Sequence, residues 1–351
     1  MIEEIRVQSW NELLDRLYEG SWHPAHGRFR PPFVFRALAH RDRPLTTSLH
    51  RLGGSFGGLE YHVLRNFRKY AHRSAAPGDS AWNWLAVAKH HGLPTRLLDW
   101  TFSPFVALHF TTEHLEDFAR DGVIWCVNCV EAQRFLPRSL AELLHKEGAS
   151  VFTADMLDSY ARTLSTFDER VRKEGAPCVI FFEPPSLDER IVNQMALFSM
   201  MSDPVSQLEP WLAAKQPECS KLCWKIVVPA PLKWEIRDKL DMANITERVI
   251  YPGLDGLSQW LKRYYSPSNI IELEYPEGAC LAVIERFDGS LMHVGRYAQG
   301  SGPRPAVITT GADGVWRDAG SGETISVNPK PAPEKISRLL ELLSKRGAAP
   351  E

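Results

Sequence analysis

Three short runs of apolar residues, rich in β-branched and aromatic side chains, recur along the middle of the chain. They read GVIWCVNCV at residues 122–130, APCVIFFEP at 176–184 and CWKIVVPA at 223–230. Runs of this length and composition are typical of buried strands, and stretches of helical or loop character separate them. Strands that are interleaved with helices predict an α/β fold class, with a mixed sheet flanked by helices.

Capping residues mark helix ends on both sides of a tight polar turn. A helix is expected to start near Ser80, and Gly92 suits the position just after its last turn. Ser103 and Pro104 suit the N-cap and the first position of the next helix. The turn at residues 95–101 should therefore be short and semi-rigid.

The amino-terminal part predicts one helix and one strand. Residues 5–18 place apolar side chains at helical spacing, with Ser9 as N-cap. Residues 33–35 follow a proline pair and predict a short buried strand that ends at Arg36.

Beyond Tyr275 the sequence pattern changes from one that predicts helices to one that predicts short strands and turns. Two apolar runs flank Asp288-Gly289, a dipeptide typical of a hairpin turn. A proline-rich stretch at 329–333 then precedes a helical pattern at 336–346. We therefore divide the chain into a helical lead at 1–30, a main domain at 31–270 and a small β-rich unit with a final helix at 276–351.

Charge and hydropathy narrow the function classes. The 351 residues include 41 basic and 43 acidic side chains, for a net charge of -2, so no global field attracts nucleic acid or anionic lipid. Nucleic acid could bind only through a local patch. No apolar stretch is long enough to span a bilayer, and the acidic, amphipathic amino terminus does not resemble a secretory signal. We expect a cytoplasmic protein without membrane contact, whose six cysteines are reduced.

The cysteine spacing invites a zinc interpretation, which we reject. Cys126 and Cys129 have a two-residue spacing, and Cys219 and Cys223 follow much later. Cys126 lies in a strand-like run, where successive side chains point to opposite faces, so we predict no metal site. The sequence also contains no Walker phosphate loop, GxGxxG, HExxH or GxSxG motif. P-loop NTPases, ordinary dehydrogenases, zincins and α/β-hydrolases are therefore not leading candidates.

Two blocks resemble the FRG domain family of bacterial and phage proteins. They are FVFRALAHRDRPLTTSLHRL at 33–52 and AVAKHHGLPTRLLDWTFSPFVALHF at 86–110, and the second resembles the most specific segment of the family. DERIVNQMALFS at 188–199 and ITERVIYPGLDGLSQWLKRYY at 245–265 resemble the downstream part of longer members. The resemblance runs from about Pro32 to Tyr265. The main domain is then an FRG domain with a C-terminal extension.

The chain departs from the family pattern at two places. Ala37 stands where the family has glycine, and Met195 follows Gln194 where glycine is usual. We expect the backbone to approach a ligand differently at both positions.

Several polar residues of these blocks suit ligand binding, and each also has a structural alternative. Arg36 offers a permanently charged fork for phosphate or carboxylate, or pairs with Asp99 or another internal acid. Arg96 and Asp99 lie three residues apart, and we favour a local ion pair between them. The hydroxyls of Thr101 and Ser103 bind a ligand or only cap a helix.

The aromatic and histidine positions carry similar alternatives. His91 ends a helix beside the polar turn, where it faces either a cleft or solvent. Trp100 stacks on a base or packs in the core. We predict that Arg36 and the segment 95–103 line one concave pocket, because both place polar groups at the ends of apolar elements.

Arg36, Thr101 and Gln194 resemble, in order and residue type, the three-part sites of ADP-ribosyltransferases. This is an analogy at the level of the fold. In such sites the first residue binds the dinucleotide, the second orients the nicotinamide ribose, and the third polarises a ribose hydroxyl or the acceptor. Ser103 fits the second role as well as Thr101. The analogy implies no resident cofactor and NAD as the substrate, with Arg36, His91, Arg96, Trp100 and Ser103 in contact with it.

Two other functions stay open. The first is a non-catalytic module that binds a nucleotide, with residues 276–351 contacting a partner protein; Gln194 favours it, since transferases commonly carry Glu at the third place. The second is a nuclease-like effector. Family members are found in bacterial defence and toxicity, but metal-dependent cleavage of a phosphodiester would need clustered Asp and Glu.

Overall fold

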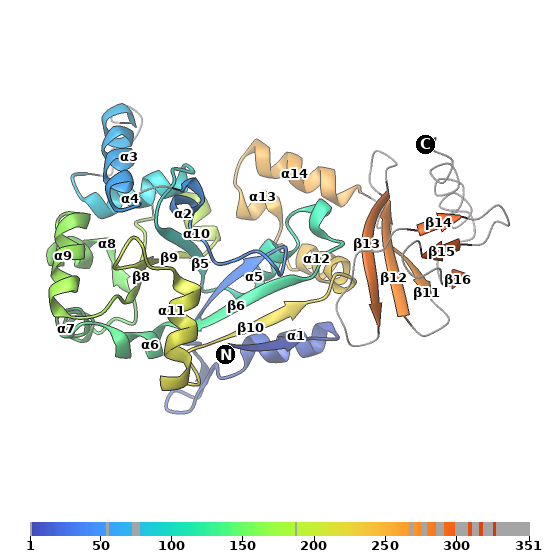
Figure 1. The fold of residues 1–351 in the computed structure, drawn as a ribbon, viewed down its shortest axis with the longest axis horizontal. Helices are drawn as coiled ribbons and strands as arrows, with labels where there is room; N and C mark the ends of the chain where they lie inside the picture. Colours follow the sequence, from blue (N-terminus) through green and yellow to red (C-terminus); the bar gives the residue numbers. More distant parts are fainter. Residues whose placement is uncertain are drawn as a thin grey trace.

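The computed structural model describes residues 2–53, 56–71, 78–186 and 188–266, together with six strands between residues 270 and 327 (Figure 1). Its main element is an eight-stranded sheet of order β1-β10-β6-β4-β5-β9-β8-β7. The three apolar runs of the sequence become β6, β8 and β10, which confirms the predicted α/β class. The strands are β1 Glu3–Arg6, β4 Phe33–Leu38, β5 Leu97–Thr101, β6 Gly122–Asn128, β7 Phe152–Thr153, β8 Val179–Glu183, β9 Ala196–Met201 and β10 Cys223–Val228.

The sheet parts into two halves between β4 and β5. β4 pairs with β6 over residues 33–38, and β5 pairs with β9 over residues 97–101. Between β4 and β5 the register contains one pair alone among the described residues, Phe35 opposite Thr101. The halves β1-β10-β6-β4 and β5-β9-β8-β7 therefore diverge from a single point of contact.

Fourteen α-helices in the described parts of the chain surround this sheet (Figure 1). They are α1 Trp10–Tyr18, α2 Ser48–Leu52, α3 Phe56–Ala71, α4 Ala81–His90, α5 Pro104–Thr111, α6 Cys129–Ala132, α7 Arg138–Glu147, α8 Ala154–Tyr160, α9 Leu164–Glu174, α10 Glu189–Asn193, α11 Leu208–Lys215, α12 Leu232–Met242, α13 Glu247–Ile250 and α14 Leu254–Tyr264. Short 3₁₀ turns occupy Leu115–Asp117, Gln133–Phe135 and Gln216–Glu218.

The local helix signals of the sequence hold in detail. The Ser9 side chain accepts a hydrogen bond from the Glu12 amide, and Ser103 accepts one from the Val106 amide. Gly92 adopts φ 80°, the left-handed conformation that favours glycine after a helix. Two predictions were wrong. Residues 3–6 form β1, which pairs in parallel with β10, so the helix begins only at Trp10. Residues 97–101, predicted as part of a turn, form strand β5, which pairs with β9.

The core differs on the two faces of the sheet. One buried cluster runs across both halves, joining Val34 and Trp125 to Leu98 and Phe181. Two further large clusters of buried side chains are separate from it and from each other. One packs β5, β8 and β9 against α4, α7, α8 and α9, and the other packs β4, β6 and β10 against α1, α5 and α12. The sheet is thus continuous on one side and divided on the other.

Beyond Ser266 the described residues are all strands. β11 Ile270–Glu274, β12 Ala279–Glu285, β13 Leu291–Ala298 and β16 Ser326–Val327 form a sheet of order β13-β12-β11-β16, and β14 Ile308–Thr310 pairs with β15 Trp316–Asp318. β12 and β13 are antiparallel, as a hairpin requires. The turn at Asp288-Gly289, the stretch 329–333 and the helical pattern at 336–346 lie outside the described residues. The division at residues 270–276 stays a prediction.

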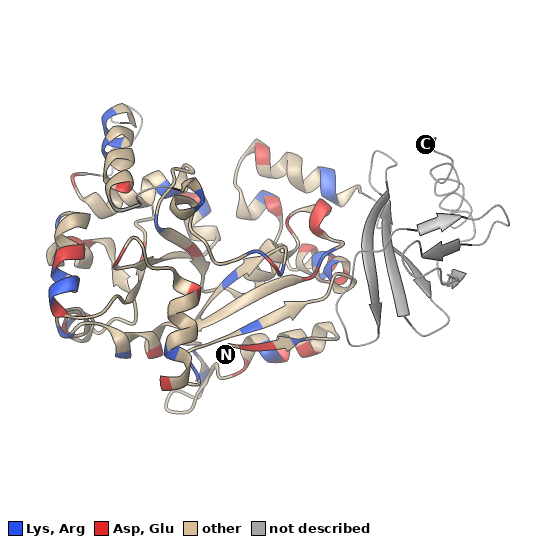
Figure 2. Cartoon of the chain, viewed as in Figure 1, with Lys and Arg blue, Asp and Glu red and all other residues tan. Residues whose placement is uncertain are grey.

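Charged side chains and cysteines are distributed over many elements of the described residues. Basic and acidic side chains are interspersed over the helices (Figure 2), and none of the described helices is long and apolar enough to cross a bilayer. Cys126, Cys129, Cys178, Cys219 and Cys223 are buried free thiols. No group of three or more His, Cys, Asp or Glu in the described parts of the chain could hold a metal ion.

Candidate functional site

A cavity of about 670 Å³ lies where the two halves of the sheet part. Its wall takes residues from β4, from the end of α4, from β5, from α10 and from the segments that follow α5 and α13. Five of the seven residues predicted from the sequence line it, namely Arg36, His91, Trp100, Thr101 and Gln194. Arg96 and Ser103 do not.

Arg36 spans the gap between the two halves. Its Nη1 donates to the carbonyl oxygen of Asp99 at 2.6 Å and lies 3.6 Å from the Asp99 carboxylate. A side-chain donor thus replaces the backbone ladder that β4 and β5 lack here. The Asp99 carboxylate is half exposed and also pairs with Lys89 at 2.7 Å.

A second nitrogen of the Arg36 guanidinium has no partner among the described residues. This nitrogen, Nε, is buried. Burial lowers the pKa of Arg36 from its ordinary value, an effect that Asp99 partly opposes. A buried cationic donor without a partner is costly, and an anion in the cavity would relieve this cost.

Arg96 forms buried ion pairs away from the cavity. Its guanidinium pairs with Glu60 at 2.7 Å and with both carboxylate oxygens of Asp168 at 2.9 and 3.0 Å. The predicted pair with Asp99 is not formed, because residues three apart on an extended segment point to opposite faces. Arg96 is 2% exposed and does not line the cavity. Burial alone would lower its pKa, but the two carboxylates raise it above the ordinary value.

The hydroxyls of Thr101 and Ser103 make hydrogen bonds to backbone groups. Thr101 Oγ1 donates to the Gln194 carbonyl at 2.7 Å and accepts from the Ser103 amide at 3.0 Å. Ser103 caps α5. Thr101 therefore positions Gln194, which joins α10 to β9. The Gln194 side-chain amide donates to the Ile250 carbonyl at 3.3 Å, and its oxygen makes no hydrogen bond to a described residue.

Trp100 borders the cavity but offers no ring for stacking. Its indole nitrogen donates to Ser199 at 2.8 Å, its ring packs against Phe181, and the residue is 3% exposed. His91 is exposed on the wall, with its ring edge-on to His90. His90 pairs with Asp188 at 2.6 Å, and burial holds the pKa of His90 below its usual value despite this partner.

A second cavity of about 620 Å³ adjoins the first and shares four of its wall residues, His90, Glu113, Arg190 and Tyr251. Tyr251 donates its hydroxyl to Glu113 at 2.5 Å, and the Arg190 guanidinium lies 4.8 Å from the centre of the Tyr251 ring. We did not single out these residues from the sequence. The only signal was the position of Tyr251 and Arg190 inside the two downstream blocks.

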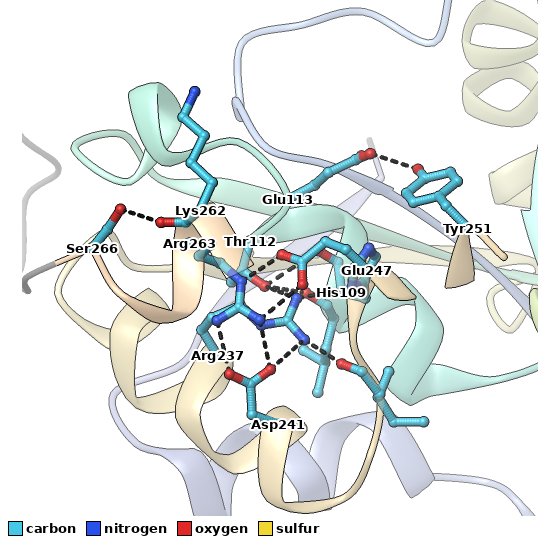
Figure 3. Close-up of polar contacts among 12 residues, drawn as sticks. His109, Thr112, Glu113, Arg237, Asp241, Glu247, Tyr251, Lys262, Arg263 and Ser266 are labelled. Carbon is cyan, nitrogen blue, oxygen red and sulfur yellow. Dashed lines mark hydrogen bonds and ion pairs between the residues drawn. The ribbon is translucent and has the colours of Figure 1, made fainter. Parts of the chain in front are cut away.

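A buried polar network supports the segment that carries Tyr251 (Figure 3). Arg263 of α14 bonds Glu247 of α13 and Asp241 of α12. Arg237 Nη1 lies 2.8 Å from His109 Nδ1. Burial and Arg237 hold the pKa of His109 well below its usual value, so the ring is neutral and Nδ1 accepts. α13 leads directly into Tyr251, so this network fixes one wall of the site.

Met195, beside Gln194, adopts a left-handed conformation with φ 45°. This is the position where the family has glycine. Met195→Gly should raise the free energy of unfolding by about 0.5–1 kcal/mol, because a side chain costs roughly 1–2 kcal/mol in this conformation and the greater freedom of unfolded glycine offsets part of the gain.

Urea unfolding checks this prediction. Asn244→Gly is the matched control, since Asn244 has φ 58° but asparagine tolerates this region, so its gain should be smaller. A Met195→Gly protein less stable than the parent would show that the Met195 side chain contributes packing that outweighs the strain.

Comparison with known families identifies the first part of this site. Residues 31–120 match the FRG domain model, while no curated protein and no solved structure matches the chain. The matched range holds Arg36, His91 and Thr101, whereas Gln194 and Tyr251 lie beyond it. The chain therefore contains an FRG domain at residues 31–120, which includes the strand that carries Arg36 and the polar segment that follows α4.

Proposed function

We propose that the 670 Å³ cavity is a nucleotide site, that NAD is its ligand and that the reaction is transfer of ADP-ribose. One observation carries the proposal. Arg36 lies on β4, Thr101 lies on β5, and Gln194 ends α10 two residues before β9; β4, β5 and β9 are neighbours in the sheet, and the three residues line one cavity. This order is the one that the analogy with ADP-ribosyltransferases requires.

Arg36 is the candidate ligand for the diphosphate. The Nε edge of its guanidinium is a buried cationic donor without a partner among the described residues, and such a fork binds phosphate oxygens in pairs. The volume lies within the range of cofactor sites and is ample for a dinucleotide. Lys89 and Arg190 add positive charge to the same wall.

Transfer breaks the bond between the nicotinamide nitrogen and the anomeric carbon of the ribose. The bonding electrons leave with nicotinamide, and the ribose becomes transiently cationic before the acceptor forms the new bond. Such a step needs positioning and a nearby negative group. In this proposal the Gln194 amide orients the ribose and the Glu113 carboxylate supplies the charge that Gln194 lacks. Thr101 acts as a positioning residue through the Gln194 carbonyl.

The test follows binding and chemistry separately. Calorimetric titration of the full chain with NAD should show binding, and chromatography should show release of nicotinamide. Arg36→Gln should weaken binding roughly tenfold to a hundredfold, the value of a charged hydrogen bond. Arg172→Gln on α9, which removes the same charge away from the cavity, should leave affinity unchanged.

The outcomes separate the candidates. Binding that depends on Arg36 without nicotinamide release favours the non-catalytic nucleotide module, which Gln194 already favours. Absence of binding at millimolar NAD would contradict the proposal that the cavity binds NAD. Release that survives Glu113→Gln would remove Glu113 from the mechanism. A role in bacterial defence or toxicity rests on the family resemblance alone, and no observation favours a nuclease-like effector.

A further inference from the structure

A smaller cavity of about 240 Å³ lies between α3 and the start of α9, outside the site described above. Three arginines line it, Arg65 and Arg68 on α3 and Arg162 just before α9. Lysine and arginine are frequent along α3 (Figure 2). The side chains of Thr163 and Ser165 complete the polar part of its wall.

These arginines have no acidic partner. Within the described residues, no carboxylate lies within 4.0 Å of Arg65, Arg68 or Arg162. Arg65 reaches only the His62 ring at 3.4 Å, and Arg68 lies over the Trp84 ring at 5.6 Å.

Two carboxylates on the helices that border this cavity, Glu60 of α3 and Asp168 of α9, are already occupied. Glu60 and Asp168 both hold Arg96, and Asp168 also accepts from the Tyr61 hydroxyl at 2.7 Å. Tyr61 itself lines the cavity. Three like charges therefore line one hollow with no ion-pair partner among the described residues. Arg65 and Arg162 are exposed and Arg68 is half-buried, so solvent screens their mutual repulsion, and an anion in the hollow would be attracted to all three.

We propose that this cavity binds the phosphate group of a small phosphomonoester. Guanidinium forks match phosphate oxygens in pairs. Thr163 caps α9 and shares a hydrogen bond with the exposed Ser165 hydroxyl, so the arginines are the principal donors. The volume is about a third of that of the main cavity, so it admits a phosphate with a small substituent rather than a dinucleotide. This inference does not rest on the proposed function of the main cavity.

The experiment is a calorimetric titration of the full chain with inorganic phosphate and, separately, with ribose 5-phosphate, against sodium chloride at equal ionic strength. Either phosphate should bind at one site per chain. Arg65→Gln, Arg68→Gln and Arg162→Gln should each weaken binding about tenfold, the effect of one lost charge-assisted contact. Arg138→Gln removes an equal charge from an exposed position on α7 and should change nothing.

Two further arms locate the site and its ligand. Arg36→Gln should leave phosphate binding intact, and binding lost with Arg36 would overturn the proposal by placing the phosphate in the main cavity. Tighter binding of ribose 5-phosphate than of inorganic phosphate identifies a phosphomonoester as the ligand. Equal binding of the two identifies the free phosphate ion as the ligand and contradicts the proposal of a phosphomonoester. Absence of phosphate binding at 10 mM, or an equal loss in Arg138→Gln, contradicts the site altogether. Thermal unfolding of each variant checks that it folds.

Discussion

Replacement of Arg96 by methionine should lower the free energy of unfolding by about 3–5 kcal/mol, the usual result of removing one partner from a buried ion pair. Arg96, Glu60 and Asp168 have side chains that are 1%, 1% and 5% exposed. Methionine fills a similar volume but leaves two carboxylates without their cation in the interior. The loss should appear as a lower urea midpoint with an unchanged slope.

Two variants make this test specific. Arg138→Met breaks the exposed pair with Glu142, whose side chains are 90% and 63% exposed, and should change stability by less than about 0.5 kcal/mol. Adding Glu60→Gln and Asp168→Asn to Arg96→Met removes the uncompensated charges, so the triple variant should recover part of the loss. If the single variant unfolds at the same midpoint as the parent, the Arg96 network contributes no net stability.

Arg263→Met should cost about 3 kcal/mol at neutral pH, because it removes the cation between buried Glu247 and Asp241 (Figure 3). Arg237 remains nearby, at 3.8 Å from Asp241, and limits the loss. Arg16→Met, which breaks the exposed pair with Glu19, is the control and should have little effect.

The same variant should change the dependence of stability on pH. In the parent, burial alone would raise the pKa of Glu247, but the hydrogen bond from Arg263 and the charge of Arg237 hold it below its ordinary value. Its contribution is therefore present at neutral pH and is lost as pH falls below about 4.5, through the folded pKa.

Without Arg263, burial should raise the folded pKa of Glu247 above that of the unfolded chain. The carboxyl then takes up a proton on folding, so the deficit of Arg263→Met should be smaller at pH 5 than at pH 7. Urea unfolding at both values measures the difference. A deficit that is equal at the two values would show that Glu247 stays ionised in the variant.

The elements that depend on neighbours in the sequence were predictable. Apolar runs of strand length specify β6, β8 and β10 because their composition suits a buried sheet, and a serine followed by proline specifies the start of α5 because the cap is made within four residues. The same local signals predicted that Arg36 and the turn after α4 would carry polar groups at the ends of apolar elements.

Only the tertiary structure decided which groups meet. Apolar composition marks a strand but says nothing of its neighbours, so the parting of β4 from β5 and the cavity between them could not be foreseen. Arg96 takes its partners 36 and 72 residues away, and Tyr251 meets Glu113 across 138 residues. Local spacing favoured an Arg96–Asp99 pair, but the alternation of an extended strand turns these side chains apart. The sequence by itself therefore determined the α/β class and the caps at Gly92 and Ser103, whereas long-range pairing made residues 97–101 a strand and selected which polar groups support the fold and which face the cavity.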